Sequence, residues 1–106
     1  MSEFCDFIVE QLHPLAPINV KRMFGCWGLF RYGKMFAIID DDLLYIKVDE
    51  KSKPLFIQEG CEPFRYFTTR KGVRTQVALN YYQLPETALD NSDELCYWAR
   101  LGISAG

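Results

Sequence analysis

The chain has 106 residues, a hydrophobic fraction of 49% and a charged fraction of 25%, which are the values of a globular domain and not of a disordered chain. Its formal net charge is −2, so it lacks the overall basic excess with which nucleic-acid-binding proteins usually attract phosphates. No run approaches the roughly 18 apolar residues of a membrane-spanning helix, and the acidic first residues do not form a signal peptide. We therefore expect one cytoplasmic domain, residues 1–106, with no membrane contact.

The first element is predicted to be a helix that begins after Ser2, whose hydroxyl can cap a helix N-terminus. Apolar residues then recur at three- and four-residue spacing, which makes one apolar face of a helix. They are Phe4, Phe7, Ile8, Leu12 and Leu15. Pro14 and Pro17 are expected to end this helix, because proline has no amide hydrogen to donate.

Residues 19–24 are harder to assign, and Asn19 could cap one further short helical turn that carries Lys21 and Arg22. After residue 25 the pattern changes to that of strands. Three strands are predicted, at residues 27–31, 35–39 and 43–48. Because short turn-forming segments separate them, neighbouring strands must pair antiparallel.

A second helix is predicted to run to about Glu59, with Gly60 in the left-handed conformation that often closes a helix. Either Asp49 or Ser52 could cap its N-terminus. The later start is favoured because it brings Pro54 into the first turn, where proline is tolerated.

A second hairpin is predicted from residues 64–69 and 76–82, with its turn at residues 70–72. The last helix is predicted to open at Asp90, with Asp93 in its first turn. Its inward residues are expected to be Leu95, Trp98 and Ala99. The order is helix, three strands, helix, two strands, helix, which predicts an α+β domain with two layers and a mostly antiparallel sheet.

The residues that could support catalysis or metal binding are few and widely spaced. His13 is the only histidine, and it lies eight residues from Cys5, about 12 Å along the same predicted helix. The cysteines contain no C-x-x-C pair and are predicted to be reduced, mostly buried thiols. They are Cys5, Cys26, Cys61 and Cys96. We predict no catalytic residue, no metal site and no cofactor, with an enzyme that uses the thiol of Cys26 or Cys61 as the remaining alternative.

Basic residues gather on and near the tip of the second hairpin. They are Arg65, Arg70, Lys71 and Arg74. Tyr66 and Phe67 lie beside them, and a basic β-ribbon with aromatic side chains can follow a nucleic-acid backbone. Positive charge also protects exposed strands from pairing with other chains. Nucleic-acid binding at this hairpin is therefore the alternative functional hypothesis.

A series of short blocks follows in a characteristic order and spacing from about residue 18 onward. The blocks are Arg22-Met23-Phe24-Gly25, Gly28-Leu29-Phe30, Gly33 with Met35-Phe36-Ala37, Leu44-Tyr45-Ile46-Lys47-Val48-Asp49, Gly60, Pro63-Phe64, Tyr81-Tyr82 with Leu84-Pro85, and Trp98-Ala99. Together they resemble the TfoX N-terminal domain family. The resemblance implies a fold similar to that of secretion chaperones and no established catalytic residues. The family includes regulators of natural competence, which act in bacterial transcription alongside the cyclic-AMP receptor protein and add a C-terminal domain.

The leading functional hypothesis is a non-enzymatic regulatory module that binds a protein, with the transcription machinery as a candidate partner and a homodimer as a candidate assembly. The expected contact surface combines basic, aromatic and glycine residues. It comprises Lys21, Arg22, Met23, Phe24, Gly25, Trp27, Tyr81 and Tyr82. For each apolar member of this set, a place in the core is an equally good interpretation.

Overall fold

The structure is a computed structural model, and it describes residues 2–23 and 25–105, apart from the side chains of Arg70, Val77 and Ala78. Its elements follow one another along the chain as α1 (Glu3–Gln11), the 3-10 turn η1 (His13–Leu15), β1 (Asn19–Met23), β2 (Cys26–Arg31), β3 (Lys34–Asp40), β4 (Leu43–Lys47), α2 (Lys53–Gln58), β5 (Pro63–Arg70), β6 (Val73–Gln83), the 3-10 turn η2 (Glu86–Ala88) and α3 (Ser92–Ser104).

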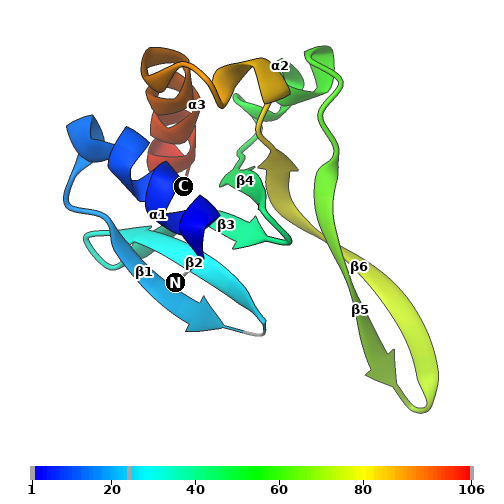
Figure 1. The fold of residues 1–106 in the computed structure, drawn as a ribbon. Coiled ribbons are helices and arrows are strands. Elements are labelled where there is room, and N and C mark those ends of the chain that lie inside the picture. The colour runs from blue at the N-terminus through cyan, green and yellow to red at the C-terminus, as the bar shows by residue number, and fades with distance from the viewer. Residues whose placement is uncertain (1, 24, 106) are drawn as a thin grey trace.

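The strands form one antiparallel sheet in the order β1-β2-β3-β4-β6-β5, so β1 and β5 are its edges (Figure 1). Three of its hairpins turn on two residues that both have positive φ. These pairs are Tyr32-Gly33, Asp41-Asp42 and Lys71-Gly72, with φ between 50° and 80°. Such turns match the right-handed twist of the strands that they join.

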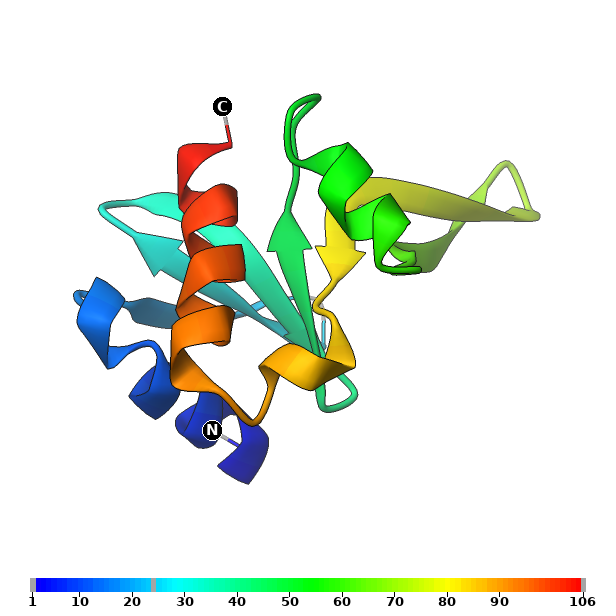
Figure 2. The ribbon, with the colours of Figure 1, turned by 90° about the horizontal axis from the view of Figure 1, so that it is seen from above.

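The helices lie on one face of this sheet, with α3 running along it (Figure 2). The approach of α3 is close at Gly102, where an added Cβ would lie 2.7 Å from both the Phe36 carbonyl oxygen and the Ile46 Cγ2. Beside α3, Phe56 of α2 is fully buried, and its ring centre is 4.7 Å from that of Trp98. The main hydrophobic core therefore fills the space between the helices and this face of the sheet.

The predicted α+β class, the two layers and the antiparallel hairpins are confirmed. One strand was missed, since residues 19–23 form β1 and not a helical turn after Asn19. Val20 pairs with Leu29 of β2, and Val20 packs on the main core. Pairing with a neighbouring strand, which local pattern does not reveal, thus decides the structure here.

The ends of the helices also differ from prediction in their details. Helix α1 ends at Gln11, and Phe7 of its predicted apolar face is 40% exposed. Helix α3 is capped by Asn91, whose side-chain oxygen accepts a hydrogen bond from the Glu94 N–H, and not by Asp90. Gly60 has the predicted left-handed conformation, with a φ of +77°.

Both predicted candidates for the cap of α2, Asp49 and Ser52, take part in the turn before the helix. Ser52 is the residue before the helix, as predicted, but its hydroxyl accepts a hydrogen bond from the Asp49 N–H instead of from the helix. The Asp49 carboxylate in turn accepts hydrogen bonds from the N–H groups of Lys51 and Ser52. The two side chains therefore close the turn ahead of α2 together.

Three of the cysteines, Cys26, Cys61 and Cys96, are free thiols, and the fourth, Cys5, is buried in the main core. Cys26 and Cys96 are also buried, as predicted. Within the described residues, the helices are all too short or too polar to cross a membrane.

Candidate functional site

The face of the sheet that carries no helix has an apolar cluster of its own. Cys26, Ile38, Phe64 and Tyr81 are its buried members. The side chains packed against them are Met23, Met35, Tyr45 and Leu79. Since successive residues of a strand point to opposite faces, several of these residues alternate with neighbours in the main core, as Ile38 does between Ala37 and Ile39.

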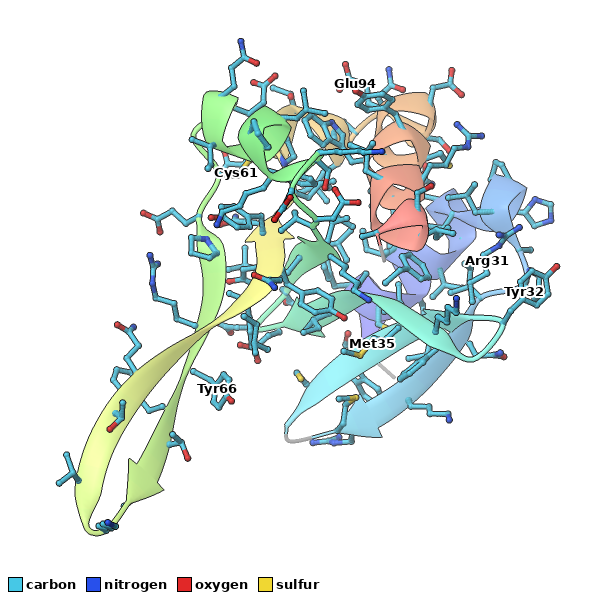
Figure 3. The ribbon with its side chains drawn as sticks, turned by 180° about the vertical axis from the view of Figure 1, so that it is seen from behind. Arg31, Tyr32, Met35, Cys61, Tyr66 and Glu94 are labelled. Atoms are coloured by element: carbon cyan, nitrogen blue, oxygen red, sulfur yellow. The ribbon has the colours of Figure 1, made fainter. Side chains whose placement is uncertain are left out.

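A hollow of about 670 Å³ lies over this cluster, and we call it the groove. Its lining is Met23, Cys26, Met35, Ile38, Asp40, Phe64, Arg65, Tyr66, Phe67, Thr68 and Leu79. The lining comes from both edge strands, β1 and β5, so the sheet curls toward its open face. Figure 3 shows Met35 of β3 and Tyr66 of β5 on opposite sides of the space between the body of the sheet and the β5–β6 hairpin.

Methionine side chains cover a glycine in the floor of the groove. A Cβ added at Gly28 would lie 2.9 Å from the Sδ atoms of both Met23 and Met35 and 3.0 Å from the Cε1 atom of Phe30. These thioether chains fill the space that Gly28 leaves, and such chains adapt readily to an irregular neighbour. The floor can thus change shape without movement of the backbone.

Aromatic rings form the wall of the groove on the β5 side. The Phe64 ring meets the Tyr45 ring edge-on, with their centres 4.9 Å apart. Tyr66 is next along the same face, 6.4 Å from Phe64, and remains 41% exposed. The buried Phe64 ring thus lies beside the exposed Tyr66 ring, which a ligand can contact.

Beyond the groove, the β5–β6 hairpin projects from the body of the domain, and we call residues 63–83 the arm (Figure 1). The arm contains four basic residues and no acidic residue, whereas the whole chain has a net charge of −2. The rest of the chain therefore has a net charge of −6. A count of acidic residues by segment reveals this charge separation from the sequence alone.

The residues predicted as a nucleic-acid site are placed along the arm. Arg65 lines the groove, and Lys71 is exposed in the turn. The Arg74 guanidinium carbon lies 4.2 Å from the centre of the Phe67 ring, which is 56% exposed. The predicted Arg70 belongs to β5, but its side chain lies outside the described part of the structure.

The residues predicted as a protein-contact surface are divided between the two faces of the sheet. Met23 and Tyr81 belong to the cluster under the groove. Trp27 and Tyr82 instead pack into the main core on the opposite face. Tyr81 and Tyr82 are consecutive residues of one strand, so they point to opposite faces and cannot both belong to one contact surface on the sheet.

The remaining members of that predicted surface lie along or beside the edge strand β1. Lys21 and Arg22 are exposed, and each cation lies over a ring of β2. The Lys21 Nζ is 5.1 Å from the centre of the Phe30 ring, and the Arg22 guanidinium carbon is 5.2 Å from that of Trp27. Gly25 is an exposed turn residue with a φ of +81°, and the predicted Phe24 lies outside the described residues.

Burial raises the pKa of two thiols, and one of them, Cys26, lines the groove. Burial raises the pKa of the Cys26 thiol, with Asp40 as the second cause, and the Cys26 S–H donates a hydrogen bond to the Met23 carbonyl oxygen at 3.0 Å. Burial followed by Glu59 raises the pKa of the Cys61 thiol. A thiol nucleophile needs the opposite shift, so neither environment favours an activated cysteine.

His13 and the acidic residues do not form a second candidate site. His13 is exposed in η1, whereas Cys5 of the adjacent helix is buried in the main core. Across the described residues there is no group of three or more histidine, cysteine, aspartate or glutamate side chains that could hold a metal ion. The groove and the arm are therefore the surfaces that a functional proposal must explain.

A family model described as the TfoX N-terminal domain matches residues 10–106, which is nearly the whole chain. The chain belongs to the TfoX N-terminal domain family. The DNA transformation protein TfoX1 of Aliivibrio fischeri (strain ATCC 700601 / ES114) is 29% identical over 87 residues, which are 81% of this chain and 39% of that protein. Protein Sxy of Escherichia coli (strain K12) is 28% identical over 96 residues, which are 91% of this chain and 44% of that protein. The chain thus spans less than half the length of these relatives.

Proposed function

We propose that this domain is a non-enzymatic regulatory module that binds a segment of another protein in the groove. The observation that carries the proposal is an apolar, aromatic and methionine-lined hollow on the face of the sheet that the helices leave open. Its volume of about 670 Å³ is in the range typical of binding pockets, about 300–1,000 Å³. Exposed tyrosine and arginine side chains such as Tyr66 and Arg65 are the types that contribute most at protein interfaces.

The biological setting of the proposal comes from the relatives. One of them is named as a DNA transformation protein, and we extend that role to this chain as a regulator of the same process. The expected partner is a protein of the transcription machinery. The free thiols of Cys26, Cys61 and Cys96 support a reducing, cytoplasmic location for this function.

A quantitative pull-down with groove variants tests the proposal. Met35→Glu places a charge in the floor of the groove, whereas the control Tyr32→Glu places one at an exposed turn position. The native chain and both variants are immobilised in equal, folded amounts. We expect Met35→Glu to lose the partner protein that the native chain retains, and Tyr32→Glu to keep it. Equal retention by both variants would contradict a groove-based partner site.

Nucleic-acid binding by the arm is the second candidate function, and the arm's four basic residues without an acidic one are the observation that favours it. The affinity for duplex DNA would then fall steeply with salt, with a logarithmic slope of about −0.9 for each phosphate neutralised. Arg70→Ala and Arg74→Ala should each weaken binding and reduce that slope by about one unit. An absence of any gel shift at low salt would exclude this function.

A further inference from the structure

The open edge of β5 borders the groove along much of its length. Five consecutive residues, 64–68, line the hollow. Side chains of a strand alternate between the two faces, so a face alone would contribute only every second residue. From this continuous run we infer that the edge of the strand itself, with its backbone groups, is turned toward the hollow.

The register of the arm shows which backbone groups face outward. In a two-residue hairpin the pair that closes the turn, here Arg70 and Val73, exchanges two hydrogen bonds. Hydrogen-bonded pairs then alternate along the hairpin, so Thr68 and Tyr66 also bond to β6. The intervening residues Phe67 and Thr69 therefore direct their N–H and C=O groups to the open edge.

The floor opposite this edge determines which side chains an added strand should carry. Met23, Met35 and Ile38 form an apolar surface within the same hollow. In a strand lying along β5, every second side chain would point to this floor. The occupant should therefore have large apolar residues at alternate positions over about five or six residues, the usual length of a strand.

Charge indicates what the remaining side chains of the occupant should be, and it disfavours a second copy of this chain as the occupant. The arm has four basic residues and no acidic one, and the basic Lys21 and Arg22 lie on β1. Two copies paired along β5 would bring two such arms together with no acidic partner, which is unfavourable. An acidic segment instead neutralises them. Asp40 is the acidic residue of the lining, so the acidic side chains belong toward Arg65 and the arm.

We propose that an extended, acidic segment of a partner protein adds to the sheet as a strand beside β5, with alternate apolar side chains in the groove. The inference rests on the proposed function and names the binding mode and the class of partner. Strand addition supplies affinity through backbone hydrogen bonds and specificity through the pockets that take alternate side chains.

The test begins with selection of binders from a phage-displayed library of random dodecapeptides. We expect the selected sequences to carry apolar residues at every second position and acidic residues between them. A synthetic peptide of the commonest sequence is then added to ¹⁵N-labelled protein. The amides of Phe67 and Thr69 should become protected from hydrogen exchange, whereas those of Tyr66 and Thr68, already bonded to β6, should change little.

A pair of substitutions isolates the backbone hydrogen bond. Phe67→Ala removes the ring alone, and Phe67→Pro removes the ring and the outward N–H while leaving the bonds to β6 in place. Loss of one hydrogen bond should make the proline variant bind the peptide about tenfold more weakly than the alanine variant. Proton spectra of both variants check that the sheet is intact.

The outcomes separate this inference from the function on which it rests. A peptide that shifts the Met35 amide signal without protecting the Phe67 and Thr69 amides would overturn strand addition and leave groove binding standing. Equal affinities for Phe67→Pro and Phe67→Ala would also overturn it. Selection of no peptide, together with salt-dependent binding of duplex DNA, would overturn both and favour the nucleic-acid alternative.

Discussion

The two faces of the sheet differ in what surrounds the glycine that lies at each of them. On the covered face, Gly102 of α3 lies against the Phe36 carbonyl oxygen, and backbone cannot move aside for a Cβ. On the open face, Gly28 lies against the sulfur atoms of Met23 and Met35, which are the ends of flexible side chains. One face therefore depends on close packing for stability, whereas the other retains an adaptable apolar surface that contributes less to stability and is available for binding.

The largest expected effect on stability comes from a substitution in the core under the covered face. Phe56 is fully buried between the sheet and α3, in contact with the Trp98 ring. Phe56→Ala should lower the free energy of unfolding by about 3–5 kcal/mol, because it removes a large apolar side chain and leaves a cavity. Urea unfolding followed by circular dichroism measures this. A loss no larger than that of Met35→Ala, its counterpart on the open face, would contradict the comparison.

The next effect concerns the close approach of α3. Gly102→Ala should lower the free energy of unfolding by about 1–3 kcal/mol, because the added methyl group meets backbone at 2.7 Å. Thermal unfolding gives the difference from the native chain. An unchanged melting temperature would show that α3 can move away from β3 and β4 without penalty.

A smaller effect is expected from the matching change on the open face. Gly28→Ala should change the free energy of unfolding by less than about 1 kcal/mol, because the methyl group meets only side chains, the Met23 and Met35 thioethers and the edge of the Phe30 ring, and these can shift. The same variant should bind the selected peptide more weakly, since the displaced methionines raise the groove floor. Stability and binding are measured on one sample, and a large loss of stability with unchanged binding would reverse the roles of the two faces.

The smallest effect is on pH dependence. Burial raises the pKa of the Tyr81 hydroxyl above its usual 10.0. A group whose pKa is higher in the folded state stabilises the fold below its unfolded pKa, and this contribution is lost as the pH rises through the folded value. The urea midpoint should therefore fall above pH 10.0, and less so in Tyr81→Phe. Parallel pH profiles for the two proteins would be inconsistent with this account.

Much of the fold could be predicted because its strands have strong local signals. The alternation through Leu44, Ile46 and Val48 identified a half-buried strand, and pairs such as Lys71-Gly72 identified the turns. The strand β1 was missed because it is an edge strand with mostly exposed side chains. Its structure depends on pairing with β2, which no local pattern reports.

The candidate site was harder to predict than the fold. Met23 and Tyr81 were selected from the sequence, but Ile38 and Leu79 were not, since nothing local tells which face of a sheet the helices leave open. Trp27 and Tyr82 were selected for their rings and lie in the main core. The curl that brings β1 and β5 to one groove arises from the whole sheet and is visible only in the structure.

Site-specific photo-crosslinking compares the two faces most directly. Tyr66 on the open face and Tyr97 on α3 are both exposed, at 41% and 49%, so each can be replaced by a benzoyl-phenylalanine without disturbing a core. With the selected acidic peptide, we predict a crosslink from position 66 that Met35→Glu abolishes, and none from position 97. A crosslink from position 97 alone, or from both positions equally, would contradict the claim that the open face of the sheet is the binding surface.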